Sequence, residues 1–353
     1  MSRPRRSENK GLPARWRHYH GAYYYQVPPG MENRWEGKKQ FKLGSTLPEA
    51  YRAWAARLQA ADTKLRTIDD LLDRYSLEVV PAKAPRTQAA NSEAIRRLKA
   101  VFGGVPVIDF KPIHAYQYRD KRGKLAPTSA NRELEVLSHA FTKAIEWGAR
   151  ETHPMIEGKF RKIPTPPRMR YVEDDEIVKA LSLKPRRKRG SVLAVQAYMR
   201  VKLLTGLRRG DLLRLRIGDL QADGIHVQPH KTAQTTGKRL IIEWTQALQD
   251  AVDEAKSARP VHIAPWLFCN ADGECYVKDN GTANGWDSMW QRFMDRVIKE
   301  TGLEQRFTEH DLRAKCASDA DTLAHAQQLL AHASSATTNR IYRRKPERVK
   351  PLR

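Results

Sequence analysis

The chain has 353 residues, enough for two or three domains of ordinary size. It carries 64 lysines and arginines against 40 aspartates and glutamates, a formal net charge of +24 that is spread along its whole length. Such a charge predicts several surfaces that face a polyanion, and nucleic acid is the usual one. No apolar run approaches the roughly 18 residues of a membrane span, and none follows the basic start, so neither a membrane helix nor a signal peptide is predicted.

Cysteine usage points to a reducing compartment. Cys269, Cys275 and Cys316 form no C-x-x-C pair and no even set, so we expect free thiols and no structural zinc site.

Residues 1–62 are predicted to form a small β-rich domain. A basic arm precedes an aromatic cluster at 16–25 and an alternating segment at 39–44, which indicates two or three short strands. A helix is expected from about residue 48 to 60. Basic and aromatic side chains on one face of such a sheet suit DNA binding, although the same aromatics equally suit an ordinary core.

Residues 63–158 are predicted to be a bundle of four or five helices. Helical spacing of apolar residues marks two of them, through Ile68, Leu71, Leu72, Tyr75 and Val79, and through Leu134, Leu137, Phe141, Ile145 and Trp147. The sequence TSAN at 128–131 offers N-cap residues to the second helix. Prolines and basic residues at 159–170 predict an extended basic linker.

Residues 171–353 are predicted to form a mixed, mainly helical domain. Helices are expected over 191–205, 208–216, 246–257, 285–301 and 311–324. Strands at 224–228 and 239–243 are expected to flank a polar connection at 230–238.

Several polar residues in this last domain are candidates for chemistry. Arg208 begins a predicted helix, where free backbone N–H groups favour an anion. Arg209 points about 100° away, so at most one of the two arginines faces a given site. His310 and Arg313 are three residues apart and share one helix face. The other candidates are Lys231, His332 and Tyr342. Each of these residues alone is more often an ordinary surface residue, so the functional interpretation depends on the order in which they occur.

In that order the motifs resemble the tyrosine recombinase (phage integrase) family. They are TGLRRGDLLRL at 205–215, KT at 231–232, HDLR at 310–313, LLAH at 329–332, and Tyr342. SANREL at 129–134 and AIEWG at 144–148 look like the helical core-binding (SAM-like) domain of that family, and the first sixty residues look more loosely like an arm-type DNA-binding domain. Two departures are Ala331, where the family often has glycine, and one extra residue between His332 and Tyr342.

The resemblance implies metal-free cutting of DNA, with no cofactor. Tyr342 would be the nucleophile that forms a 3′-phosphotyrosyl link, and His310 its acid/base partner. Arg208 and Arg313 would hold the charged phosphate, with a further hydrogen bond donated by His332. Lys231 would protonate the leaving 5′-oxygen. Asp211 would support Arg208.

The implied architecture is multidomain: an N-terminal DNA-binding domain at 1–62, a core-binding domain at 63–158, a linker at 159–170 and an α+β catalytic domain at 171–353. The implied function is integration or excision of a phage or mobile element in the cytoplasm of a bacterial host. The expected partners are double-stranded attachment sites, three further copies of the chain, and a DNA-bending host factor or excisionase.

Three alternatives share parts of this pattern. A catalytically silent DNA-binding relative would have lost one of the six polar residues, and none is lost. A type IB topoisomerase fits the separate helical and N-terminal blocks less well. A Xer-like resolvase would typically be shorter and lack the first sixty residues.

Overall fold

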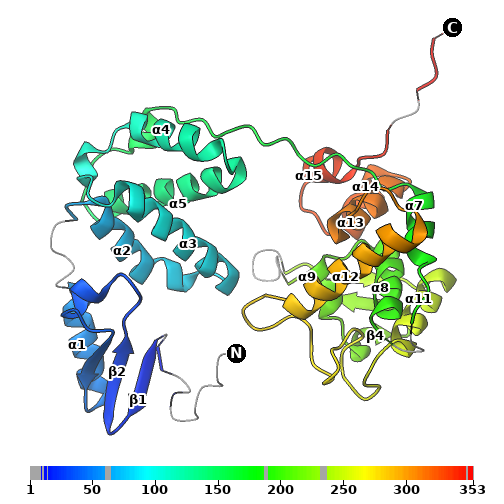
Figure 1. The fold of residues 1–353 in the computed structure, drawn as a ribbon, viewed down its shortest axis with the longest axis horizontal. Helices are drawn as coiled ribbons and strands as arrows, with labels where there is room; N and C mark the ends of the chain where they lie inside the picture. The colour runs from blue at the N-terminus through cyan, green and yellow to red at the C-terminus, as the bar shows by residue number, and fades with distance from the viewer. Residues whose placement is uncertain are drawn as a thin grey trace. The chain divides into compact units, whose positions relative to one another are not determined.

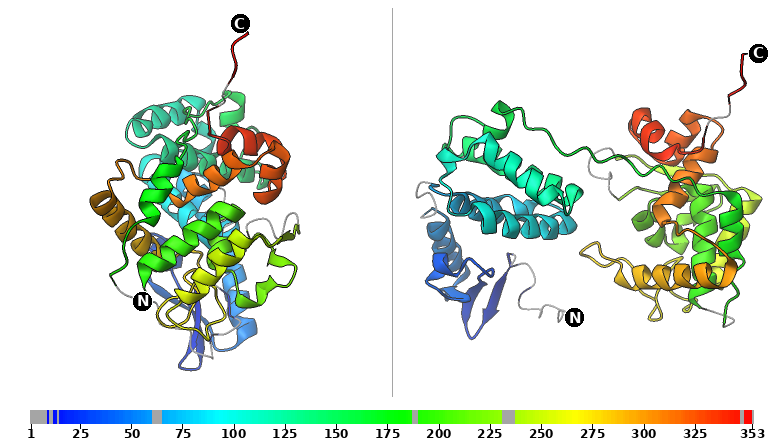
Figure 2. Two further views of the ribbon diagram at one scale, coloured as in Figure 1. Left: turned by 90° about the vertical axis from the view of Figure 1, so that its right-hand side faces the viewer. Right: turned by 45° about the horizontal axis from the view of Figure 1, so that its top comes forward.

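The computed structural model describes residues 9, 12–13, 15–59, 65–186, 190–230, 237–346 and 349–352. The chain divides into two compact units, Met1–Thr165 and Pro166–Arg353, and each is described by itself (Figures 1 and 2). Over the described residues both units are mainly helical and each contains one small antiparallel sheet, which confirms the expected fold class. No helix among these residues is long and apolar enough to cross a membrane.

The first unit begins with a three-stranded antiparallel sheet and a helix. Its elements are β1 Trp16–Tyr19, β2 Ala22–Gln26, the 3-10 turn η2 Glu32–Trp35, β3 Gln40–Gly44 and α1 Leu47–Gln59. Alternation along the strands buries Trp16, Tyr25 and Leu43 on one face, together with Ala50 of α1. This small core is distinct from the core of the helical bundle that follows.

The other face of the sheet carries a row of basic and aromatic side chains. Arg17, Tyr24 and Lys42 lie opposite one another on the three strands. Tyr19 stacks on Tyr24 with ring centroids 4.3 Å apart, and both Arg17 and Lys42 are exposed. The aromatic cluster therefore divides between the two faces, since Tyr25 is buried while Tyr19 and Tyr24 face outward.

The rest of the first unit is a helical bundle around one core. Its elements are α2 Ile68–Glu78, η4 Val80–Ala82, α3 Pro85–Phe102, η5 Val107–Asp109, α4 Pro112–Gly123, α5 Pro127–Glu146 and α6 Pro154–Glu157. The apolar spacing predicted for the two helices is confirmed in α2 and α5, whose residues Leu71, Leu72, Leu134 and Leu137 are fully buried or nearly so.

The N-cap predicted for α5 within residues 128–131 is wrong. The helix begins at Pro127, and no side chain caps it. Proline has no N–H to satisfy and its fixed φ suits the first helical position, so the helix begins there without a cap. Asn131 has a different role: its side chain exchanges two hydrogen bonds with the backbone of Ile163, of 2.8 and 2.9 Å.

Residues 160–173 form neither helix nor strand, as their proline content predicts. In the first unit the bonds from Asn131 hold Ile163 against α5. In the second unit Arg170 donates to Glu176 and to the backbone of Gln305. The segment is therefore held by hydrogen bonds near each of its ends.

The second unit is built around α8 Ser191–Thr205, which packs against α11, α12 and α13 (Figure 1). Its other helices are α7 Asp174–Leu181, α9 Arg209–Leu213, α11 Gln246–Ser257, α12 Asn284–Thr301, α13 Glu309–Asp319, α14 Leu323–Leu329 and α15 Ser335–Thr337, followed by the π-helical turn η7 Thr338–Tyr342. The sheet contains β4 Leu220–Gln221, β5 Gly224–Val227 and β6 Leu240–Ile242, and the 3-10 turn η6 Ile217–Asp219 precedes it.

Two helices of this unit differ from their predictions. The helix expected over 208–216 is the short α9, after which the chain passes into η6. The helix expected over 311–324 is two helices, because Ala320 adopts an extended conformation with ψ 136° and ends α13. Thr322 then caps α14 by accepting a hydrogen bond from the His325 amide.

Candidate active site

Three of the candidate residues surround Tyr342, which ends η7. The Tyr342 ring lies 5.1 Å from the His310 ring and 4.8 Å from the His332 ring, measured between centroids. The guanidinium carbon of Arg313 lies 5.4 Å from the centroid of the same tyrosine ring. His310 and Arg313 come from one face of α13, as their spacing predicts. The fold thus gathers residues that are up to 32 positions apart in the sequence.

Arg313 is buried and holds the surrounding segments together. Only 3% of it is exposed. One terminal nitrogen donates to the carbonyl of Gly206, and the other donates to the carbonyl of Leu330 at 2.8 Å. Burial, and after it the charge of Arg208, lower the pKa of Arg313 to about 10, so the group stays charged at neutral pH. One cation therefore ties α13 to the turn before Arg208 and to the turn before His332.

His332 is almost fully buried and neutral. Its Nε2 lies 3.3 Å from Nη2 of Arg313, which can only donate, so Nε2 is the acceptor and the proton is on Nδ1. Nδ1 then donates to the hydroxyl of Thr338 at 2.9 Å. Burial and the charges of Arg313 and Arg208 lower the pKa of His332 to about 4. In this arrangement Nε2 carries no proton to donate to a phosphate.

His310 projects from the first turn of α13, and the residue is exposed. Desolvation of its ring, followed by the charges of Arg344 and Arg313, lowers its pKa from the usual 6.5. The imidazole is accordingly neutral at pH 7 and has a nitrogen free to accept a proton. That state suits the base expected beside a tyrosine nucleophile.

Arg208 occupies the N-cap position of α9, before the first helical residue. The Gly206 carbonyl, two residues before it, accepts from Arg313, and the charge of Arg208 lowers the pKa of both Arg313 and His332. The buried carboxylate of Asp211 accepts a hydrogen bond from the His230 amide at 2.9 Å. This bond anchors the residue just before Lys231, which itself lies outside the described residues.

The 100° helical separation predicted for Arg208 and Arg209 does not apply, because Arg208 is extended and lies before the first helical residue. Arg209 is instead held by acidic residues of α12 and α13. It forms ion pairs with Asp287 and, at 3.8 Å, with Glu309. Glu309 is buried and also accepts hydrogen bonds from Trp286 and from Tyr198, the latter at 3.1 Å. Burial raises the pKa of Glu309, an effect that the charge of Lys202 and these donors oppose.

Lys202 is a buried lysine that the sequence analysis missed. It is 1% exposed, and its ammonium donates to the carbonyl of Leu207 at 2.8 Å, directly before Arg208. Burial lowers the pKa of Lys202 to about 7, and the charge of Glu309 acts in the opposite direction. Its place in the mostly apolar segment 192–204, which also holds Gln196 and Arg200, was the available signal.

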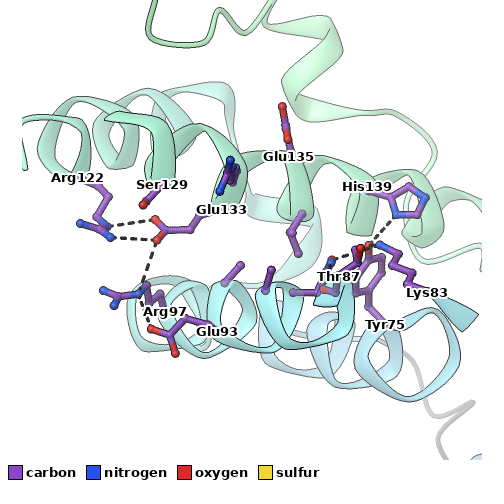
Figure 3. Close-up of a pocket in the computed structure, with 15 residues that line it drawn as sticks. Tyr75, Lys83, Thr87, Glu93, Arg97, Arg122, Ser129, Glu133, Glu135 and His139 are labelled. Atoms are coloured by element: carbon purple, nitrogen blue, oxygen red, sulfur yellow. Dashed lines mark hydrogen bonds and ion pairs between the residues drawn. The ribbon is translucent and has the colours of Figure 1, made fainter. Parts of the chain in front are cut away.

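The first unit has a separate groove of about 580 Å³ between α3 and α5 (Figure 3). In its wall the carboxylate of Glu133 bridges Arg122 and Arg97, while Tyr75 contacts Lys83 and His139 (Figure 3). The exposed residues Ser129 and Arg132, from the SANREL motif, also line it. The groove thus combines a polar lining with several cations.

The three cysteines are free. In the part of the chain that the structure describes, no group of three or more His, Cys, Asp and Glu residues is placed to hold a metal ion.

The chain belongs to the phage integrase family, whose model matches residues 170–348, about half of the sequence. No curated protein matches the chain in sequence. Among solved structures, a lambda integrase fragment, in a dimer bound to a core site, aligns with a TM-score of 0.65 at 20% identity and covers 80% of this chain and 99% of that one. The lambda integrase tetramer bound to a Holliday junction aligns with a TM-score of 0.62 at 19% identity, and the alignment covers 99% of each chain. The Tn1549 transposon integrase in complex with circular intermediate DNA aligns with a TM-score of 0.60 at 18% identity, and the alignment covers 78% of this chain and 95% of that one. At these identities the likeness establishes the fold, which is that of a tyrosine recombinase with an N-terminal β domain.

Proposed function

We propose that this chain is a site-specific DNA recombinase that cuts and rejoins duplex DNA through a 3′-phosphotyrosyl intermediate, with Tyr342 as the nucleophile. The observation that carries the proposal is the arrangement around Tyr342, where a buried, charged Arg313 and two neutral imidazoles surround one phenol. A phosphate needs a fixed positive charge, and a phenol needs an acceptor for its proton; this arrangement offers both.

The proposed step balances without metal or nucleotide. The Tyr342 oxygen attacks the phosphorus, its proton passes to His310, and the bond to the 5′-oxygen breaks. Lys231 gives that oxygen a proton. One phosphodiester is exchanged for another, so the reverse attack by a 5′-hydroxyl rejoins the strand and restores the free tyrosine.

Arg313 and Arg208 serve as donors to the non-bridging oxygens, on which charge grows in the transition state. Loss of one such preorganised donor typically costs about 3–4 kcal/mol of transition-state stabilisation. The terminal nitrogens of Arg313 donate to the carbonyls of Gly206 and Leu330. A bond from His332 to the phosphate then requires His332 to leave its acceptor position beside Arg313 or to change its tautomer.

Two surfaces of the first unit are proposed to contact DNA. The groove between α3 and α5, in residues 63–158, would face the core site through Arg132 and Ser129. The row of Arg17, Tyr24 and Lys42 on the N-terminal sheet, in residues 1–62, would bind a second, arm-type site. Cations supply affinity for phosphates, and the half-buried tyrosine rings of this face supply flat contact area.

The biological role that this activity supports is integration or excision of a phage or other mobile element. The partners that we propose are two duplex attachment sites, a homotetramer of this chain and accessory DNA-bending or excision factors. The related folds support this proposal, since their structures hold integrases on a core site, a Holliday junction and circular intermediate DNA.

A suicide-substrate assay tests the chemistry. The full-length protein is mixed with a nicked duplex, selected for binding from a random-sequence pool, in EDTA, and the products are resolved on a denaturing gel. We expect a covalent protein–DNA band that disappears in Tyr342→Phe. The matched control is Tyr276→Phe, because among the described residues the Tyr276 hydroxyl has a single hydrogen-bond partner, the Met289 sulfur at 3.9 Å.

Each outcome decides between the readings. A band that survives Tyr342→Phe would identify another nucleophile and refute the assignment. Tight binding with no band from the wild-type protein would favour the catalytically silent DNA-binding relative.

A further inference from the structure

Asp311 lies in α13 between His310 and Leu312, and its carboxylate is buried, since the residue is 0% exposed. Its Oδ1 accepts from Arg344 at 2.7 Å and from Arg168 at 2.9 Å. Its Oδ2 accepts from the amide and hydroxyl of Thr308, each at 2.9 Å. Burial alone would raise the pKa of Asp311, but the Thr308 and arginine hydrogen bonds outweigh it and lower the pKa, so the group is an anion.

Arg344 is the buried partner of this anion and lies two residues after Tyr342. Its side chain is 1% exposed, whereas that of Arg168 is 48% exposed. Besides Asp311, Arg344 donates from Nε to the carbonyl of Ile341 at 2.9 Å and from Nη1 to the carbonyl of Arg170 at 3.2 Å. A buried guanidinium that donates to one buried carboxylate and two half-buried carbonyls is held in a fixed orientation.

A second contact fixes the same segment from its backbone side. The hydroxyl of Ser318 on α13 donates to the carbonyl of Tyr342 at 2.9 Å and accepts from the Arg344 amide at 2.8 Å. The chain on both sides of the Tyr342 carbonyl is therefore tied to α13 at two points. Asp311 and Ser318 are seven residues apart, which places them on one face of the helix, two turns from each other.

We propose that Arg344 is a positioning residue for the nucleophile: by pairing with Asp311 it fixes the backbone on which Tyr342 is carried against the helix that carries His310 and Arg313. The role rests on the proposed function of Tyr342. Within the described part of the chain the Arg344 side chain donates to Asp311, Ile341 and Arg170 and not to the phenol, so it acts through the position of the tyrosine. Displacement of a reacting group by about 1 Å costs roughly 100-fold in rate, so the loss of this pair should show in the cleavage step.

The test compares Arg344→Met with the matched variant Arg343→Met. Both remove one positive charge from adjacent residues, but Arg343 takes no part in the Asp311 cluster. Full-length proteins are assayed for single-turnover formation of the covalent complex at saturating nicked duplex, and for the dissociation constant of the same duplex. We expect Arg344→Met to slow covalent-complex formation by roughly 100-fold, with DNA affinity equal to that of Arg343→Met.

A second substrate separates positioning from proton transfer. In a duplex whose scissile 5′-oxygen is replaced by sulfur, the leaving thiolate needs no proton. A variant with a misplaced nucleophile stays slow on this substrate, whereas a defect in leaving-group protonation is rescued. We expect Arg344→Met to stay slow on both substrates.

The outcomes are separable. Equal cleavage by the Arg344 and Arg343 variants, or rescue of Arg344→Met by the sulfur substrate, would overturn the positioning role. If Arg344→Met does not fold, Arg344→Lys decides: it keeps a charge for Asp311 but cannot also reach the Ile341 carbonyl with a fork, so it should fold and cleave more slowly than Arg343→Met. Wild-type speed in the lysine variant would refute the role. Absence of covalent complex with the wild-type protein would instead refute the proposed function.

Discussion

Replacing Lys202 by methionine tests whether burial removes the charge of the amino group that donates to the Leu207 carbonyl, directly before Arg208. In the unfolded chain a lysine has its ordinary pKa of 10.5, and in the folded protein burial lowers it to about 7. Between these values the unfolded state binds more protons than the folded state, so the free energy of unfolding rises with pH across that window. Methionine has a similar length, has no charge and should remove this dependence.

The size of the effect follows from the two pKa values. One pKa unit corresponds to about 1.4 kcal/mol, so protonation of Lys202 destabilises the folded state by at most about 5 kcal/mol below pH 7. Raising the pH from 7 to 10 removes about 3 kcal/mol of this destabilisation. The hydrogen bond from Lys202 to the Leu207 carbonyl opposes the penalty by about 1–3 kcal/mol, and methionine loses that bond.

The measurement is hydrogen exchange of peptides from α8 in the full-length protein, corrected for intrinsic rates, at pH 7 and pH 10. The wild-type protein should gain about 3 kcal/mol relative to Lys202→Met between the two conditions. Lys179→Met is the control, since Lys179 forms an exposed pair with Asp175 on α7. If the free energies of opening of variant and wild type differ by the same amount at both pH values, the reasoning is refuted, because the buried amino group would then have kept its charge.

Three further outcomes are expected. The rate of covalent-complex formation should fall on the acid side with an apparent pKa below 6.5, since that of His310 is lowered; a midpoint above 6.5 would contradict its role as the base. Gly206→Ala should lower the free energy of unfolding by about 1–2 kcal/mol in chemical denaturation, because φ is +60° and the new Cβ would lie 2.9 Å from Leu330; unchanged stability would show that the turn can relax. Arg17→Gln with Lys42→Gln should reduce the slope of log affinity against log salt by about 2 on arm-type DNA, and an unchanged slope would remove that face from the DNA interface.

Helices whose ends are marked by strong local signals were predictable from the sequence. Residues 191–205 and 246–257 are helical within the predicted limits, because Gly206 ends the first and Thr245 caps the second. The break at Ala320 was not predictable, since alanine favours a helix and only tertiary packing sets the extended backbone there.

At the site, the spacing of His310 and Arg313 predicted that they would share one face of α13, and the family motifs predicted which residues would lie near Tyr342. The sequence did not predict the ion pair between Asp311 and Arg344, because two residues 33 positions apart leave no local periodicity. Ala331 is a related case: its φ of +50° explains why glycine suits that position, yet only the backbone reveals that alanine adopts the left-handed conformation here.

The bonds that frame the site end largely on main-chain atoms. Arg313 donates to the carbonyls of Gly206 and Leu330, Lys202 to that of Leu207, and Ser318 to that of Tyr342. Every amino acid carries the same carbonyl, so substitutions at the acceptor positions leave these bonds available as long as the backbone keeps its path. A lineage can therefore replace most of its side chains around such a centre while a few donors preserve its geometry, which accords with a shared fold at 20% identity.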